Sequence, residues 1–196
     1  MTYKRIALIG LGLIAGSISL GLRRAGFAGE VVGYARTAET RETAREIGLV
    51  DQVYDTATTC VGSVKAAVLD AVAPHLPESG HFVPAHPMAG TEHSGPRSGF
   101  AELFDNRWCL IVPPTDADPV AVAELETFWN LLGSDTEVVD VLHHDLVCAI
   151  VSHIPHLIAY TMVGVADDLR RESEQEVVKF YAEGFRAFTR IAPSDT

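Results

Sequence analysis

The chain has 196 residues, a formal net charge of −11 and three cysteines. This length suits one domain with a helical extension, and the negative charge argues against nucleic acid or an anionic membrane as the main partner. The cysteines Cys60, Cys109 and Cys148 form no CxxC pair, so they predict neither a disulfide framework nor a zinc ribbon, and we expect a cytoplasmic protein.

Positive charge gathers near the N-terminus. Residues 1–50 hold seven Lys or Arg against four Glu. A locally positive segment in an acidic protein suits a ligand that carries phosphate. The apolar run that follows Arg5 resembles a signal peptide, but several glycines interrupt it and no clean cleavage site follows, so a targeting role is disfavoured.

Strand and helix patterns alternate through the first 54 residues. They predict a strand at 4–9, a helix at 13–26, a strand at 30–35, a helix from Thr37 or Thr40 to 47, and a short strand at 50–54. Such alternation is typical of a parallel sheet.

The second half is less regular. It predicts a helix at 61–76, a strand near 81–84, a loop rich in Gly, Pro and Ser at 86–99, a strand at 107–112, an amphipathic helix at 118–132 and an edge strand at 135–141. A long apolar helix follows at 143–169. We expect a kink near Pro155, because proline cannot donate a hydrogen bond to the carbonyl four residues earlier.

A glycine motif links the first strand to the first helix. The sequence G-L-G-L-I-A-G at 10–16 stands where a dinucleotide fingerprint requires it. Gly10 permits the tight turn, Gly12 lets the backbone approach a pyrophosphate, and the small Ala15 permits close packing of helix and strand. Leu13 and Ile14 begin the helix whose N-terminus offers free amides to phosphate. The motif predicts a Rossmann-type domain that binds a nicotinamide dinucleotide.

The end of the second strand bears on the choice of cofactor. An acidic residue there would bind the ribose 2′-hydroxyl of NAD, but this chain has Ala35, Arg36 and Thr37. Arg36 could bind a 2′-phosphate through paired donors, and Thr37 could add a hydroxyl. We therefore expect NADP rather than NAD, although a solvated surface role for Arg36 stays open.

Several further motifs share one family resemblance. His86 opens the H-P-M-A-G segment, and it is accompanied by V-G-S-V-K at 61–65, S-H-I-P-H at 152–156 and G-F-R-A-F-T-R-I-A at 184–192. With the glycine motif, these segments resemble the prephenate and arogenate (cyclohexadienyl) dehydrogenases of tyrosine biosynthesis. The resemblance implies an α/β Rossmann-type domain at 1–141, the start of an all-helical domain that forms a homodimer at 142–196, and a small-molecule substrate.

The same resemblance implies an oxidative decarboxylation. A hydride leaves the ring carbon that bears the hydroxyl and passes to NAD(P), and the ring becomes aromatic as carbon dioxide leaves. A neutral histidine can accept the hydroxyl proton near pH 7. His86 matches this catalytic role, and Ser63 matches the serine that orients the histidine and the hydroxyl.

Substrate contacts are implied at several other positions. Arg190 matches an arginine that binds carboxylate, which its planar group can hold with two hydrogen bonds. The remaining substrate-binding candidates by resemblance are His153, His156, Glu92, Asp145 and Ser194.

Other interpretations compete with this one. The histidines at 143–156 lack the H-E-x-x-H pattern, so we expect no metal site. His93, His143 and His144 are interpreted as solvated or helix-capping residues. A β-hydroxyacid dehydrogenase would use a helix lysine, and residues 143–170 contain none. A non-catalytic nucleotide-binding remnant or interaction protein is the alternative from another functional class.

The chain departs from the family in two places. A βα unit with its return strand takes roughly 30 residues, yet Tyr54 and Val61 are too close in sequence to hold one. We therefore expect a Rossmann-type domain that lacks a βα segment near the centre of its sheet. The chain also ends just after Ser194, where the family continues into further helices. Without them, the apolar stripe at 146–166 would be exposed.

Overall fold

The computed structural model describes residues 3–55, 65–77, 80–172, 185 and 189. The chain forms two compact units, Met1–His144 and Asp145–Thr196. The first unit contains all the strands of the described residues, and the second consists of helix.

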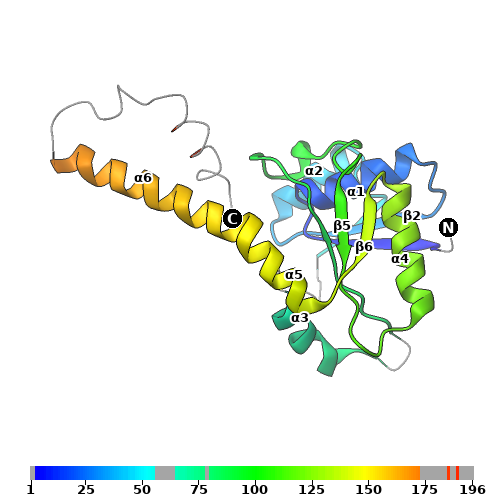
Figure 1. The fold of residues 1–196 in the computed structure, drawn as a ribbon. Coiled ribbons are helices and arrows are strands. Elements are labelled where there is room, and N and C mark those ends of the chain that lie inside the picture. The colour runs from blue at the N-terminus through cyan, green and yellow to red at the C-terminus, as the bar shows by residue number, and fades with distance from the viewer. Residues whose placement is uncertain (1–2, 56–64, 78–79, 173–184, 186–188, 190–196) are drawn as a thin grey trace. The chain divides into compact units, whose positions relative to one another are not determined.

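A parallel sheet forms the first half of the first unit (Figure 1). Strands β1 (Arg5–Ile9), β2 (Glu30–Tyr34) and β3 (Gln52–Tyr54) lie in the order β1-β2-β3. Helices α1 (Leu13–Arg24) and α2 (Ala38–Glu46) connect them. The parallel arrangement expected from the alternating pattern is confirmed for this half, and Thr37 caps α2 as one of the two predicted capping residues.

The second sheet is mixed rather than parallel. It contains β4 (Ala85–Pro87), β5 (Trp108–Ile111) and β6 (Asp135–Val138), with β4 antiparallel and β6 parallel to β5. Helix α3 (Lys65–Val72) precedes this sheet, and α4 (Pro119–Leu131) connects β5 to β6. Short 3₁₀ turns lie at Ala73–His75 and Pro96–Ser98. The parallel sheet predicted from the first 54 residues therefore does not extend into this half, where the sequence pattern is less regular.

The strand expected at 81–84 lies a few residues further along, at β4. The hydrogen bonds of β5 determine this register, because Val112 N–H donates to Pro84 O at 2.8 Å and Met88 N–H donates to Trp108 O at 2.7 Å. Proline lacks an N–H and is tolerated in an edge strand. These two hydrogen bonds are made by Pro84 and Met88, on either side of Pro87, so neither needs an N–H from Pro87. His86 lies in the strand rather than in the loop that was expected to begin there.

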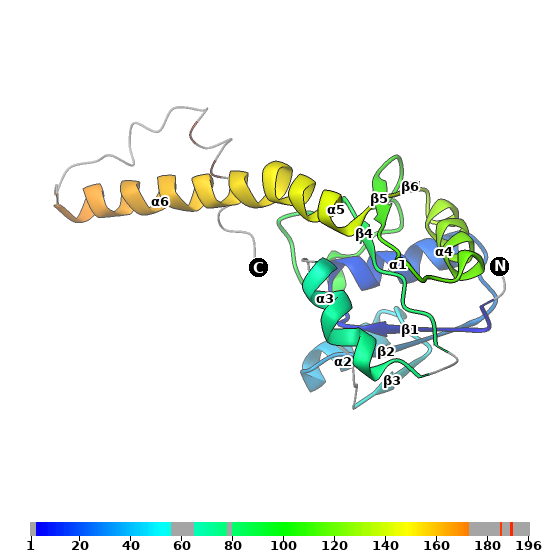
Figure 2. The same ribbon diagram turned by 60° about the horizontal axis from the view of Figure 1, so that its bottom comes forward.

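The two sheets are separate (Figure 2). Among the described strands, β1 pairs only with β2, and β4 pairs only with β5. A Rossmann sheet would have a strand beyond β1 at this position, which is where the missing βα segment was expected. One core nevertheless connects the halves, and it includes Leu8, Leu11, Phe104, Cys109 and Trp129.

The second unit continues α5 (Val141–Cys148) into a π-helical turn (Ala149–His153) and α6 (Ile154–Glu172). The irregularity predicted near Pro155 takes the form of this π turn, in which Ile154 N–H donates to Ala149 O. A widened turn accommodates a residue that cannot continue the normal hydrogen-bond pattern. By length and composition alone, the helix Val141–Asp168 could cross a membrane. Its exposed apolar side chains include Leu146, Ile150, Leu157 and Val165.

Candidate active site

The glycine turn leaves room for a ligand at the start of α1. Gly10 has φ +84°, a conformation that favours glycine, and its N–H donates to Tyr34 O at 2.8 Å. Gly12 is the N-cap, and no side chain of the described residues caps the helix there. No heavy atom of the described part of the chain lies within 4 Å of a Cβ built on Gly10 or Gly12. The open amides of this helix N-terminus fit a pyrophosphate.

The end of β2 carries cationic side chains. Ala35 is buried and Arg36 is exposed. Arg41 donates from its guanidinium to Ala35 O at 2.6 Å and Arg36 O at 3.1 Å. The Thr37 hydroxyl accepts from Thr40 N–H and donates to the Thr40 hydroxyl. Thr37 thus has a capping role here, and Arg36 is the more accessible donor for a phosphate.

A cavity of about 510 Å³ lies between the glycine turn and β4. Gly10, Ile14 and Ala15 line it on the side of the predicted dinucleotide site, and His86 lines it from β4. The remaining lining residues come from β1, α1, α3, β4 and α4: Ala7, Leu8, Ile9, Ile18, Lys65, Ala85, Pro87 and Trp129. A mainly apolar wall with a few polar groups is typical of a small-molecule site.

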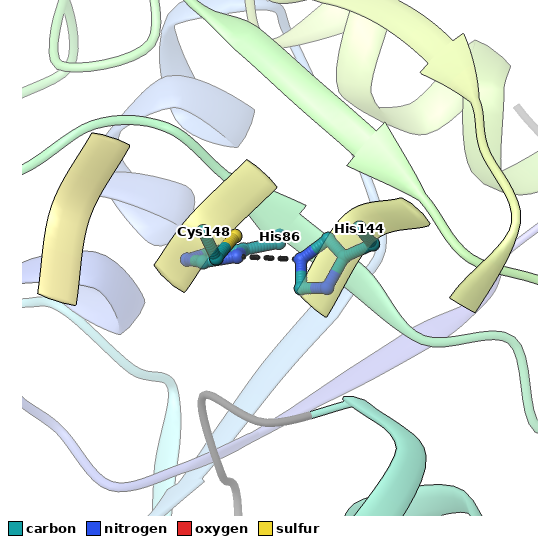
Figure 3. Close-up of side chains that lie close together, drawn as sticks. All are labelled: His86, His144 and Cys148. Carbon is teal, nitrogen blue, oxygen red and sulfur yellow. Dashed lines mark hydrogen bonds between the residues drawn. The ribbon is translucent and has the colours of Figure 1, made fainter. Parts of the chain in front are cut away.

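His86 and His144 share a hydrogen bond within the first unit (Figure 3). The His86 Nδ1 and His144 Nε2 atoms are 2.9 Å apart, and the two rings are inclined by 52°. His144 is fully buried, whereas His86 is half-buried and reaches the cavity. The interpretation of His144 as a solvated or helix-capping residue is therefore wrong, because its ring is paired with the candidate catalytic histidine.

A buried thiol and a buried cation lie in the surroundings of His86. Burial raises the pKa of the Cys109 thiol to about 12, although the backbone amide of His86 and the charge of Lys65 act in the opposite direction. Lys65 is 6% exposed and lines the cavity. The thiol is thus neutral at ordinary pH, and Lys65 supplies positive charge to the cavity wall.

The other predicted site residues fall into three groups. Leu13 begins α1, and Glu92 is exposed on the loop after β4. Asp145, His153 and His156 belong to the second unit. There, the Nδ1–H of His156 donates to Ser152 O at 2.8 Å, which leaves its Nε2 as an acceptor. The last group lies outside the described residues: Ser63, Arg190 and Ser194.

Lys65 and His144 are the residues that sequence reasoning missed. Lys65 stands in the quoted V-G-S-V-K motif but was given no role. For His144, a signal exists in Asp140, whose carboxylate accepts from Leu142 N–H at 2.9 Å and His143 N–H at 3.2 Å. A helix that begins at this cap carries His144 and Cys148 one turn apart, and both are buried. Helical phase would have separated the buried His144 from the exposed His143.

Two family models match the chain. The prephenate dehydrogenase nucleotide-binding domain matches residues 54–138. The prephenate dehydrogenase dimerization domain matches residues 140–196. Together they span most of the chain, in the order expected from the motifs.

Curated relatives and solved structures agree with these matches. A cyclohexadienyl dehydrogenase of Zymomonas mobilis is 30% identical over 228 residues, which cover 98% of this chain and 78% of that protein. A prephenate dehydrogenase of Bacillus subtilis is 31% identical over 229 residues, which cover 96% of this chain and 60% of that protein. Among solved structures, the Aquifex aeolicus prephenate dehydrogenase in complex with hydroxyphenyl propionate and NAD+ has a TM-score of 0.81 and 26% identity, with 100% of this chain and 80% of that chain covered.

The alignment lengths bear on the missing segment. The alignment with the Zymomonas mobilis protein runs over 228 positions, whereas this chain has 196 residues. At least 32 of the aligned positions therefore have no residue in this chain. A βα unit with its return strand is of about that size. The division of the described strands into two separate sheets agrees with this interpretation. The chain consists of a Rossmann-type nucleotide-binding domain followed by a helical domain. It belongs to the prephenate dehydrogenase family.

Proposed function

We propose that this chain is an NAD(P)-dependent dehydrogenase that decarboxylates prephenate, arogenate or both while oxidising them. The observation that carries the proposal is the shared cavity, which both Gly10 of the glycine turn and His86 line. A hydride acceptor held at the turn and a proton acceptor on β4 are the two groups that oxidation of an alcohol requires.

The residues around the glycine turn fit a nicotinamide dinucleotide. Gly10 and Gly12 leave the backbone uncovered, and the amides of the first turn of α1 would hold the pyrophosphate. Ile14 and Ala15 would pack against the cofactor where they line the cavity. When bound, the cofactor accepts the hydride that leaves the substrate ring.

His86 would accept the proton of the substrate hydroxyl. As the hydride leaves, the hydroxyl carbon becomes a carbonyl carbon, and the O–H proton passes to a ring nitrogen of His86. The bond to the leaving carboxylate then breaks, and its electron pair makes the ring aromatic. His86 returns the proton to the phenolate oxygen, so the histidine ends the cycle in its starting state. Ser63 is proposed to orient the hydroxyl, as the resemblance implies.

The substrate contacts are also part of the proposal. Arg190 would bind a carboxylate, and His153, His156, Asp145, Glu92 and Ser194 are proposed as further contacts. The hydrogen bond from His156 Nδ1–H to Ser152 O supports a role of its Nε2 as an acceptor. Cationic and donor groups suit a substrate with two carboxylates.

NADP is the proposed cofactor, and a second copy of the chain is the proposed partner. Exposed Arg36 and the absence of an acid at the end of β2 support NADP. The exposed apolar side chains of α5 and α6, in the segment that matches a dimerization domain, support a homodimer. The buried free thiol of Cys109 supports the reducing cytoplasm as the location.

The test is turnover by the purified chain. Prephenate and arogenate would each be offered with NAD+ and NADP+, and the reduced cofactor would be followed by absorbance. We expect turnover with at least one of the four pairs. No turnover by protein that circular dichroism shows to be folded would refute the activity and favour a non-catalytic nucleotide-binding remnant. Sedimentation and liposome flotation of the same sample test the homodimer against a membrane-bound form.

A further inference from the structure

The imidazole rings of His86 and His144 come from two different elements of the first unit. His86 is the central residue of β4, which hydrogen-bonds to β5 on both sides of it. His144 lies on α5, whose first turn is fixed by the Asp140 carboxylate and by the bond from His144 N–H to Asp140 O at 2.8 Å. Both backbones are thus held by regular hydrogen bonds. The hydrogen bond between the ring nitrogens, which are 2.9 Å apart, therefore joins side chains on two fixed backbones.

A hydrogen bond between two imidazoles requires exactly one proton between the facing nitrogens. If His144 Nε2 carries it, His86 is protonated on Nε2 when neutral, and it cannot accept a proton from a substrate. If His86 Nδ1 carries it, the Nε2 of neutral His86 carries no proton and can accept one. Only the second arrangement lets His86 act as the proton acceptor.

We propose that His144 is a positioning residue that holds neutral His86 in the Nδ1–H tautomer, so that His86 Nε2 is left to accept the substrate proton. This inference rests on the proposed function. His144 does so by accepting the hydrogen bond of His86 Nδ1–H, in the place that a carboxylate takes in other histidine-dependent enzymes. It touches neither substrate nor cofactor in this role and acts through His86.

The surroundings of His144 fit an acceptor for His86. Its ring is fully buried, and its Nε2 lies 2.9 Å from His86 Nδ1. Lys65, a buried cation, lines the same cavity as His86, and the Cys109 thiol beside His86 stays neutral. The Asp140 carboxylate is engaged by the amides of Leu142 and His143. Once His86 has accepted a proton, its Nδ1–H donates a stronger, charge-assisted bond to His144.

The tautomer can be measured without any turnover. In the full chain labelled with ¹⁵N-histidine, long-range proton–nitrogen spectra distinguish a protonated from a free ring nitrogen, and the His86 signals are assigned by their loss in His86→Asn. At a pH at which the His86 ring is neutral, we expect its proton on Nδ1. A proton on Nε2 would overturn the proposal whether or not the chain is an enzyme, which separates this test from that of the proposed function.

Variants supply the kinetic test. His144→Leu removes the acceptor and should lower kcat by roughly 10²-fold, the scale of acid–base catalysis, with KM changed by no more than about threefold. His144→Gln keeps an acceptor at the position of Nε2 and should recover at least about tenfold of that loss. His143→Leu, at the exposed neighbour, is the control. A folded His144→Leu protein that keeps kcat within about twofold of the unmodified chain would refute the role.

Discussion

Gly99 lies directly against Gly16, and a Cβ built on Gly99 would be 2.8 Å from the carbonyl carbon of Gly16. The contact holds the loop after β4 on helix α1, and Phe100 N–H donates to the Ser17 hydroxyl at 3.1 Å beside it. The loop that follows His86 is thereby attached to the helix that begins at the dinucleotide turn.

Gly99→Ala should therefore destabilise the fold. The added methyl group meets the backbone of α1, which cannot move aside as a flexible side chain could, and such overpacking costs about 1–3 kcal/mol. Urea denaturation measures the loss. Gly90→Ala is the matched control, because no heavy atom of the described residues lies within 4 Å of a Cβ there. Equal stability of the two variants would show that the contact with Gly16 is not close.

Asp51 should make the stability depend on acid pH. Its carboxylate accepts from Val31 N–H at 2.8 Å and from Arg23 at 3.0 Å, and these bonds lower its pKa below the usual 3.8. The unfolded chain then binds the proton more readily than the native one. The stabilisation is present above pH 3.8 and is lost as the pH falls through the native pKa.

Asp51→Asn tests this dependence. Both partners of the ion pair are substantially exposed, so most of the effect comes from the bond to the Val31 amide, about 1 kcal/mol near neutral pH. The difference in unfolding free energy between the chain and the variant should shrink toward zero in strong acid. A difference that is independent of pH would contradict the assigned cause.

Arg36→Ala should change the cofactor preference. Loss of a guanidinium that pairs with a 2′-phosphate should raise KM for NADP+ roughly tenfold and leave KM for NAD+ nearly unchanged. Arg45→Ala, on helix α2 and paired with Glu42, is the control. A parallel change in both Michaelis constants would show that Arg36 does not read the 2′-phosphate.

Cys109 should resist alkylation in the native protein. Burial raises the pKa of its thiol to about 12, so the reactive thiolate is scarce at mildly alkaline pH and reagent access is blocked as well. Iodoacetamide labelling followed by peptide mass spectrometry measures the rate. Labelling in urea should be faster by orders of magnitude, whereas equal rates in the native and unfolded chain would contradict this burial.

The first half of the fold follows well from local sequence. The positions of Gly10 and Gly12 between a strand and a helix determine the turn, and Thr37 marks the start of α2. Both depend on interactions within a few residues, which a sequence displays directly. The family motifs also led to His86.

The second half depends on contacts that a sequence does not display. The place of β4 is set by its hydrogen bonds to β5, more than 20 residues further along the chain, and not by its own apolar residues. His143 and His144 are identical in type, and only the phase of α5 buries one of them. The missing strand beyond β1 was inferred from spacing between motifs, because no residue pattern marks an absent segment.

Deuterium transfer from labelled substrate tests the proposed reaction. With prephenate or arogenate deuterated at the ring carbon that bears the hydroxyl, the chain should place deuterium on the reduced cofactor and release one carbon dioxide per cofactor reduced. His86→Asn should slow both by roughly 10²-fold or more. Carbon dioxide release without deuterium transfer, or neither event with folded protein, would contradict the reaction proposed here.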